Sequence, residues 1–109
     1  MADDGDILIQ VRAAAERRIL FLPHALSQMI RPERMIRRAE VRQVIERGEL
    51  VEDYPEDARG HSCLLLGFGA DRSPIHVVCS PKEDYLAVIT AYLPDEHEWS
   101  GVYRVRVRP

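Results

Sequence analysis

Three short apolar runs, separated by turn residues, constrain the fold of this chain more than any other feature. The runs occupy residues 64–67, 74–78 and 87–93, and aliphatic residues, many of them branched, dominate them. The segments between them, 69–73 and 81–84, contain Gly, Ser, Pro and Asp, which favour turns. Runs of this length with such punctuation are typical of strands joined by hairpins. The pattern therefore predicts a three-stranded antiparallel meander.

Symmetric hairpins would set the register of this meander. A first turn centred near Asp71 pairs Leu66 with His76, and a second centred near Glu83 pairs His76 with Thr90. Side chains alternate across a strand, so the meander has two distinct faces. The mixed face, expected to form a cleft floor, holds Leu64, Leu66, Phe68, His76, Val78, Val88, Thr90 and Tyr92. The apolar face, expected to lie under helices, holds Cys63, Leu65, Ile75, Val77, Cys79, Ala87, Ile89 and Ala91.

Helices are predicted before the meander. Acidic residues followed by an apolar stripe indicate a helix from about Asp4 to Arg17. Pro23 favours the start of a second helix, which Pro32 interrupts. A third helix is expected from about 38 to 47, with Gly48 as its end.

Further strands are predicted on both sides of the meander. Residues 50–54 read as a strand, whereas 19–22 form either a first strand or an extended link. Arginines alternate with apolar residues over 102–108, which is typical of a half-exposed edge strand. We therefore expect a single domain over 1–109 with an α+β fold. Its N-terminal helices pack on a twisted antiparallel sheet of about four to five strands.

Composition narrows the class of protein. The chain has 109 residues, 46% hydrophobic and 30% charged, as in ordinary globular proteins. No apolar run approaches the roughly 20 residues that span a bilayer, so we expect a cytoplasmic protein without a membrane partner. The net charge of −3 disfavours a general nucleic-acid binder, although local basic patches decide phosphate contacts. Cys63 and Cys79 are expected to be small core residues in a reducing cytosol.

Five residues carry candidate chemistry. His76 interrupts an apolar strand, where it is either a proton-transfer group or a buried structural histidine. Tyr92 is expected on the same face. It is either a second reactive group or an aromatic residue at the sheet edge whose hydroxyl contacts water. His24 lies at a helix start. It either points toward an anionic ligand or is a structural residue whose ring nitrogens have their hydrogen-bond partners. Arg34 and Arg31 either match phosphate geometry or belong to a solvated helix face.

Four of them, His24, Arg34, His76 and Tyr92, together have the chemistry of a metal-free ribonuclease. Such an enzyme needs a base for the 2′-hydroxyl, an acid for the leaving oxygen and a cation for the phosphorane charge. His61, Cys63 and His97 have no spacing that supports a zinc site. We therefore expect neither a metal nor a cofactor.

Two sequence blocks resemble the small bacterial DUF4258 family. They are Leu-Gly…Pro-x-His-Val-Val within 66–78 and Ile-Thr-x-Tyr-x-Pro-Asp within 89–95, and a likeness extends from the first helix to Trp99. Members usually carry an arginine at the position of Gln28, and Arg31 could substitute for it here.

This resemblance implies a fold and a function. Members are similar to RelE/ParE-like and BrnT-like toxins, which implies a RelE-like architecture. It also implies a metal-independent endoribonuclease toxin, neutralised by an antitoxin that carries a zinc finger and a helix-turn-helix region. On this reading Arg34 and Arg31 contact phosphate, His76 and Tyr92 transfer protons or stabilise the transition state, and His24 positions the ligand. The alternatives are a non-catalytic protein-interaction module and a pocket for a small anionic metabolite.

Overall fold

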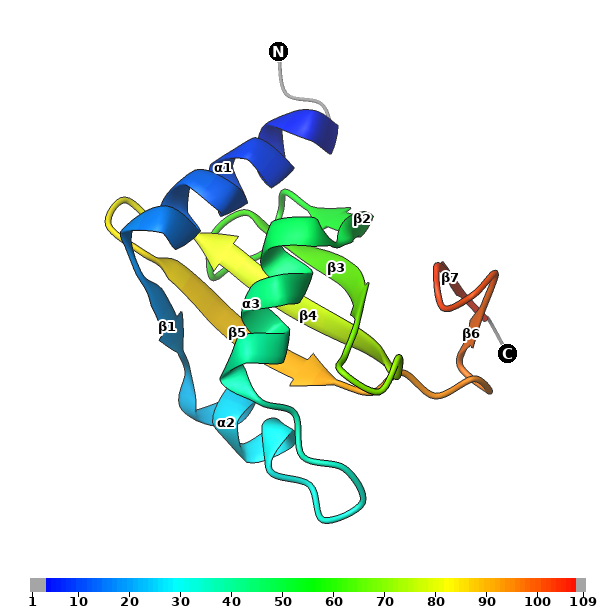
Figure 1. Ribbon diagram of the computed structural model, residues 1–109. Helices are drawn as coiled ribbons and strands as arrows, with labels where there is room; N and C mark the ends of the chain where they lie inside the picture. The colour runs from blue at the N-terminus through cyan, green and yellow to red at the C-terminus, as the bar shows by residue number, and fades with distance from the viewer. Residues whose placement is uncertain (1–3, 108–109) are drawn as a thin grey trace.

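Three helices cover one face of a five-stranded sheet in the computed structural model, which describes residues 4–107 (Figure 1). The helices are α1 (Asp4–Arg17), α2 (Pro23–Met29) and α3 (Arg38–Arg47). The strands are β1 (Ile19–Phe21), β2 (Glu49–Tyr54), β3 (Ser62–Phe68), β4 (Pro74–Pro81) and β5 (Leu86–Tyr92), in the order β1-β5-β4-β3-β2. The predicted α+β class is confirmed. Within the described residues no helix is long and apolar enough to cross a membrane.

Local sequence chemistry explains the helix boundaries, which lie where they were predicted for α1 and α3. Gly48 ends α3, and its N–H donates to the carbonyl of Val44 at 2.7 Å. A Cβ at Gly48 would lie 2.4 Å from that carbonyl oxygen and 2.6 Å from the oxygen of Leu66. Arg12 of α1 donates to the carbonyls of Ile45 and Gly48 at 3.1 and 2.9 Å. The two helices therefore join at the end of α3, where helical carbonyls lack partners.

The first hairpin has the predicted register, and the second does not. Leu66 faces His76, as expected, and the buried free thiols of Cys63 and Cys79 face each other. His76 faces Tyr92 instead of Thr90, and the register then shifts between Val78 and Cys79.

This shift inserts Ile89 as an extra residue in β5 and changes which side chains meet the helices. Val88 and Leu86 join the helix-packed core, whereas Ala87 and Ile89 lie outside that cluster although both are buried. The expectation that Ala87 and Ile89 lie on the helix-packed face is therefore wrong. A bulge reverses the alternation of side chains, which symmetric turns could not reveal.

The sheet is mixed, because β1 runs parallel to β5 at one edge. The prediction of an antiparallel sheet therefore holds for β2 to β5 and is wrong for β1. Ile19–Phe21 is the first strand, which resolves the choice between a strand and a link.

The arginine-rich tail forms a separate hairpin instead of an edge strand of the main sheet. Its strands are β6 (Trp99–Ser100) and β7 (Val105–Arg106), which pair with each other (Figure 1). The left-handed backbone of Gly101, at φ 58°, begins the turn between them. Trp99 is buried, which anchors this hairpin against the sheet face opposite the helices.

Candidate functional site

His76 and Tyr92 form a hydrogen-bonded pair across β4 and β5. Their rings meet edge to face with centroids 5.4 Å apart, and the Tyr92 hydroxyl lies 3.2 Å from Nδ1 of His76. His76 is fully buried and Tyr92 is half-buried. The prediction that both residues share one face is confirmed. The mixed face is covered at this point, however, so His76 does not form the floor of an open cleft.

The partners of His76 fix its tautomer. Its Nε2 lies 2.9 Å from the backbone carbonyl of Tyr103, which can only accept a hydrogen bond. Nε2 therefore carries the hydrogen, and in the neutral ring Nδ1 accepts from the Tyr92 hydroxyl. Burial lowers the pKa of His76, which favours this neutral ring, and burial raises the pKa of Tyr92. The pair can thus pass a proton from the Tyr92 oxygen to His76.

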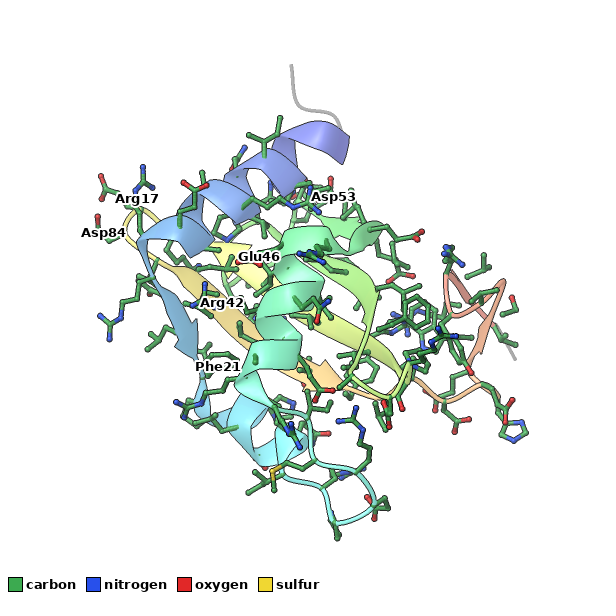
Figure 2. The ribbon with its side chains drawn as sticks, in the orientation of Figure 1. Arg17, Phe21, Arg42, Glu46, Asp53 and Asp84 are labelled. Atoms are coloured by element: carbon green, nitrogen blue, oxygen red, sulfur yellow. The ribbon has the colours of Figure 1, made fainter. Side chains whose placement is uncertain are left out.

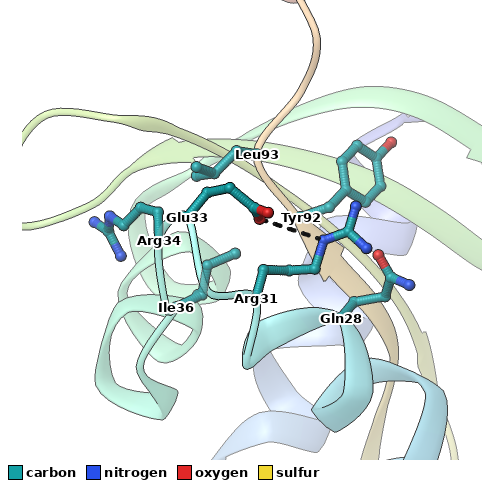
Figure 3. Close-up of a pocket in the computed structure, with 7 residues that line it drawn as sticks. All are labelled: Gln28, Arg31, Glu33, Arg34, Ile36, Tyr92 and Leu93. Atoms are coloured by element: carbon teal, nitrogen blue, oxygen red, sulfur yellow. Dashed lines mark ion pairs between the residues drawn. The ribbon is translucent and has the colours of Figure 1, made fainter.

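A small cavity of about 150 Å³ lies beside this pair. Its walls come from α2, the following loop and the end of β5: Gln28, Arg31, Glu33, Arg34, Ile36, Tyr92 and Leu93 (Figure 3). Arg31 extends toward the Tyr92 ring, and its Nε lies 4.0 Å from a carboxylate oxygen of Glu33 (Figure 3). Its side chain is 61% exposed, so the guanidinium can meet an anion from solution in competition with this long contact to Glu33.

Arg34 is held by two carboxylates. Its Nη1 and Nη2 donate to Glu40 at 2.9 and 2.8 Å, and Nη2 and Nε donate to Asp71 at 2.8 and 3.2 Å. The guanidinium lowers the pKa of Glu40 to about 2 and holds the pKa of Asp71 well below its usual range. Figure 3 shows Arg34 pointing away from Tyr92. In this structure Arg34 is the centre of an ion-pair cluster rather than an open phosphate contact.

His24 lies elsewhere. It occupies the second position of α2, where its side chain is exposed, and it does not line the cavity. The structure therefore brings His76 to Tyr92, places Arg31 in the wall of the cavity that Tyr92 also lines, and leaves His24 outside this group. Within the described part of the chain, no three His, Cys, Asp or Glu side chains are arranged to hold a metal ion.

Sequence reasoning missed the residues that surround the pair. The Trp99 ring lies edge to face against His76 at 4.5 Å between centroids, and Arg106 lies 4.6 Å over the Trp99 ring. The alternating tail and its single tryptophan were visible in the sequence, but their position over His76 was not. Glu40 was also missed: its side-chain partner Arg34 is only six residues away, and its other partners are the backbone N–H groups of Arg37 and Ala70.

The comparisons with known proteins give one match. A family model described as "Domain of unknown function (DUF4258)" matches residues 21–93. The chain belongs to this family. The DUF4258 match includes all five predicted site residues, whereas the C-terminal hairpin lies beyond it. No curated protein and no solved structure matches the chain.

Proposed function

We propose that this protein is a toxin-like, metal-independent endoribonuclease of a bacterial toxin–antitoxin module. It acts in the cytoplasm, and a cognate antitoxin of the zinc-finger and helix-turn-helix type neutralises it. The observation that carries the proposal is the hydrogen bond between His76 and Tyr92, beside a cavity that also presents Arg31. These three residues offer the base and the cation that RNA cleavage without a metal needs, and water supplies the proton for the leaving oxygen.

The hydrogen bonds of the pair suggest the chemical step. The Tyr92 oxygen takes the proton of an RNA 2′-hydroxyl while its own proton passes to Nδ1 of His76, whose ring becomes a cation. The 2′-oxygen then bonds to phosphorus as the bond to the 5′-oxygen breaks, and that oxygen takes a proton from water. Arg31 stabilises the negative charge on the phosphorane. The product end is a 2′,3′-cyclic phosphate.

The other predicted residues take supporting roles in this proposal. The guanidinium of Arg34 already holds Glu40 and Asp71, so we assign it to fixing the loop that carries Arg31. His24 stays a predicted ligand-positioning residue at the exposed start of α2.

A non-catalytic interaction module is the second candidate function. Apolar side chains are exposed around the same loop and cavity: Ile30 at 66%, Met35 at 59% and Leu93 at 37%. Exposed apolar groups that lie together favour contact with a protein partner. On this alternative the cavity residues shape a docking surface and transfer no proton.

Controlled expression distinguishes the two functions. The wild type should arrest growth and degrade cellular RNA, and Tyr92→Phe, which removes one hydroxyl, should lower cleavage by about 10²–10⁴-fold. Arg31→Ala should weaken RNA binding and reduce its salt dependence. Arg42→Ala is the matched control, because Arg42 is an exposed arginine on the outer face of α3 (Figure 2). Normal growth with intact RNA, including ribosomal RNA, would favour the interaction module.

A further inference from the structure

The C-terminal hairpin, residues 98–107, closes the space around His76. The Trp99 ring packs edge to face on the imidazole, and the Tyr103 carbonyl accepts its Nε2–H at 2.9 Å. Tyr92 occupies Nδ1, so both ring nitrogens are engaged and no part of the side chain reaches solvent. A proton that enters His76 therefore has no direct route to water while the hairpin is in place.

Side chains hold this hairpin to the sheet. Arg104 donates to both carboxylate oxygens of Glu49 at 2.6 and 2.7 Å, and Arg106 donates to Glu52 at 3.0 Å. Within residues 4–107 no backbone hydrogen bond joins β6 or β7 to the five-stranded sheet. The four ion-pair side chains are 26–50% exposed. Exposed ion pairs contribute little to the free energy that holds a structure together, and their attraction weakens as the salt concentration rises.

The turn of the hairpin is strained where it meets His76. Val102 and Tyr103 have φ angles of 56° and 67°, in the left-handed region that non-glycine residues rarely adopt. Such strain persists where surrounding contacts impose it. Release of the hairpin would relieve the backbone strain of both residues. This gain in free energy would offset part of the free energy lost with the hairpin's contacts.

We propose that the C-terminal hairpin is an autoinhibitory cap whose release opens the His76–Tyr92 pair to solvent and substrate. The proposal rests on the proposed function in taking this pair as the reacting groups. In the closed state the hairpin shields the pair from RNA and leaves His76 no direct route to water, so no proton moves from a 2′-hydroxyl. In the open state the ring exchanges its proton with water, and Tyr92 meets RNA. The ion pairs of Arg104 and Arg106 set the balance between the two states.

The reactivity of His76 toward diethyl pyrocarbonate, mapped by mass spectrometry, tests the cap without reference to RNA. In the double variant Arg104→Ala, Arg106→Ala, the rate at His76 should rise about 3- to 30-fold, as expected for two exposed ion pairs. The exposed His24 of the same molecule is the internal reference, and Arg42→Ala, from the ion pair with Glu46 on α3, is the matched control. An unchanged rate at His76 in a folded double variant would overturn the proposal.

Two further measurements, a salt series and an RNA cleavage assay, test the cap if the double variant does not fold and separate it from the ribonuclease activity. Raising salt from about 0.05 to 1 M should speed modification of His76 in the wild type, because the ion pairs are screened. If the double variant does not fold, this salt dependence tests the cap in its place, and an unchanged rate would overturn the proposal. RNA cleavage is followed in parallel. If His76 becomes reactive but RNA stays intact, the result supports the cap and contradicts the proposed ribonuclease activity. If the wild type cleaves RNA but His76 stays unreactive at every salt concentration, the result contradicts the cap and supports the ribonuclease activity.

Discussion

At the scale of single residues, one buried carboxylate organises the loop beside the cavity. Glu40 binds the Arg34 guanidinium and accepts the backbone N–H groups of Arg37 and Ala70 at 2.9 and 2.8 Å. A buried charge is tolerated when it is paired and hydrogen-bonded, as this one is. The loop that carries Arg31 is thus tied to α3 and to the turn between β3 and β4.

Glu40→Gln should destabilise the protein by about 3 kcal/mol at neutral pH, because it removes one partner of a buried ion pair. The loss should depend on pH. The folded pKa of Glu40 is about 2, below its ordinary value of 4.5, so the carboxylate stabilises the fold fully above pH 4.5. This contribution is lost as the pH falls from 4.5 toward 2.

Urea unfolding of wild type and variant at pH 7 and pH 3 measures this loss. The difference between them should shrink at pH 3, because the Glu40 carboxyl is protonated there in the unfolded chain but still largely ionised in the folded protein, where its pKa is about 2. Glu46→Gln, on the exposed face of α3, should have little effect at either pH (Figure 2). An equal difference at both pH values would contradict the assigned role of Glu40.

Residue identity predicted part of the candidate site. His76 and Tyr92 stood out as polar residues in apolar strands, and alternation predicted that they share a face. The pairing of Arg34 with Asp71 could not be predicted, because Asp71 is 37 residues away and meets Arg34 only after the hairpin forms. A row of arginines in a sequence does not show which of them already holds a carboxylate.

At the scale of elements, local chemistry predicted the helices and the first hairpin. Gly48 and Pro23 mark helix boundaries by their own backbone properties, and the turn near Asp71 is symmetric. The bulge in β5, the parallel pairing of β1 and the separate C-terminal hairpin depend on contacts between distant segments. No local pattern encodes those contacts, and the sequence therefore did not predict them.

Ile89→Ala should cost about 2–5 kcal/mol, although Ile89 lies outside the helix-packed core. The bulge leaves its side chain only 6% exposed, so truncation removes buried contacts and leaves a cavity. Chemical denaturation measures the change, with Ile9→Ala as the control because Ile9 is 67% exposed on α1. A loss below about 1 kcal/mol would show that the bulged residue contributes little packing.

At the scale of the whole molecule, the sheet is covered differently on its two faces. The helices pack on one face with a continuous apolar core, whereas the C-terminal hairpin covers the other through one tryptophan and exposed ion pairs. The cavity lies where β5, α2 and the following loop meet, beside the covered pair. This asymmetry permits a change at the site while the helix-packed core stays intact.

The chemistry of the cleaved RNA ends shows whether Tyr92 and His76 drive attack by the 2′-hydroxyl without a metal. Purified protein is mixed with end-labelled RNA in excess EDTA, and the products of wild type and Tyr92→Phe are resolved. We expect cleavage that leaves 2′,3′-cyclic phosphate ends, with rates about 10²–10⁴-fold lower for Tyr92→Phe. Products with 3′-hydroxyl and 5′-phosphate ends, or equal rates for wild type and variant, would contradict it.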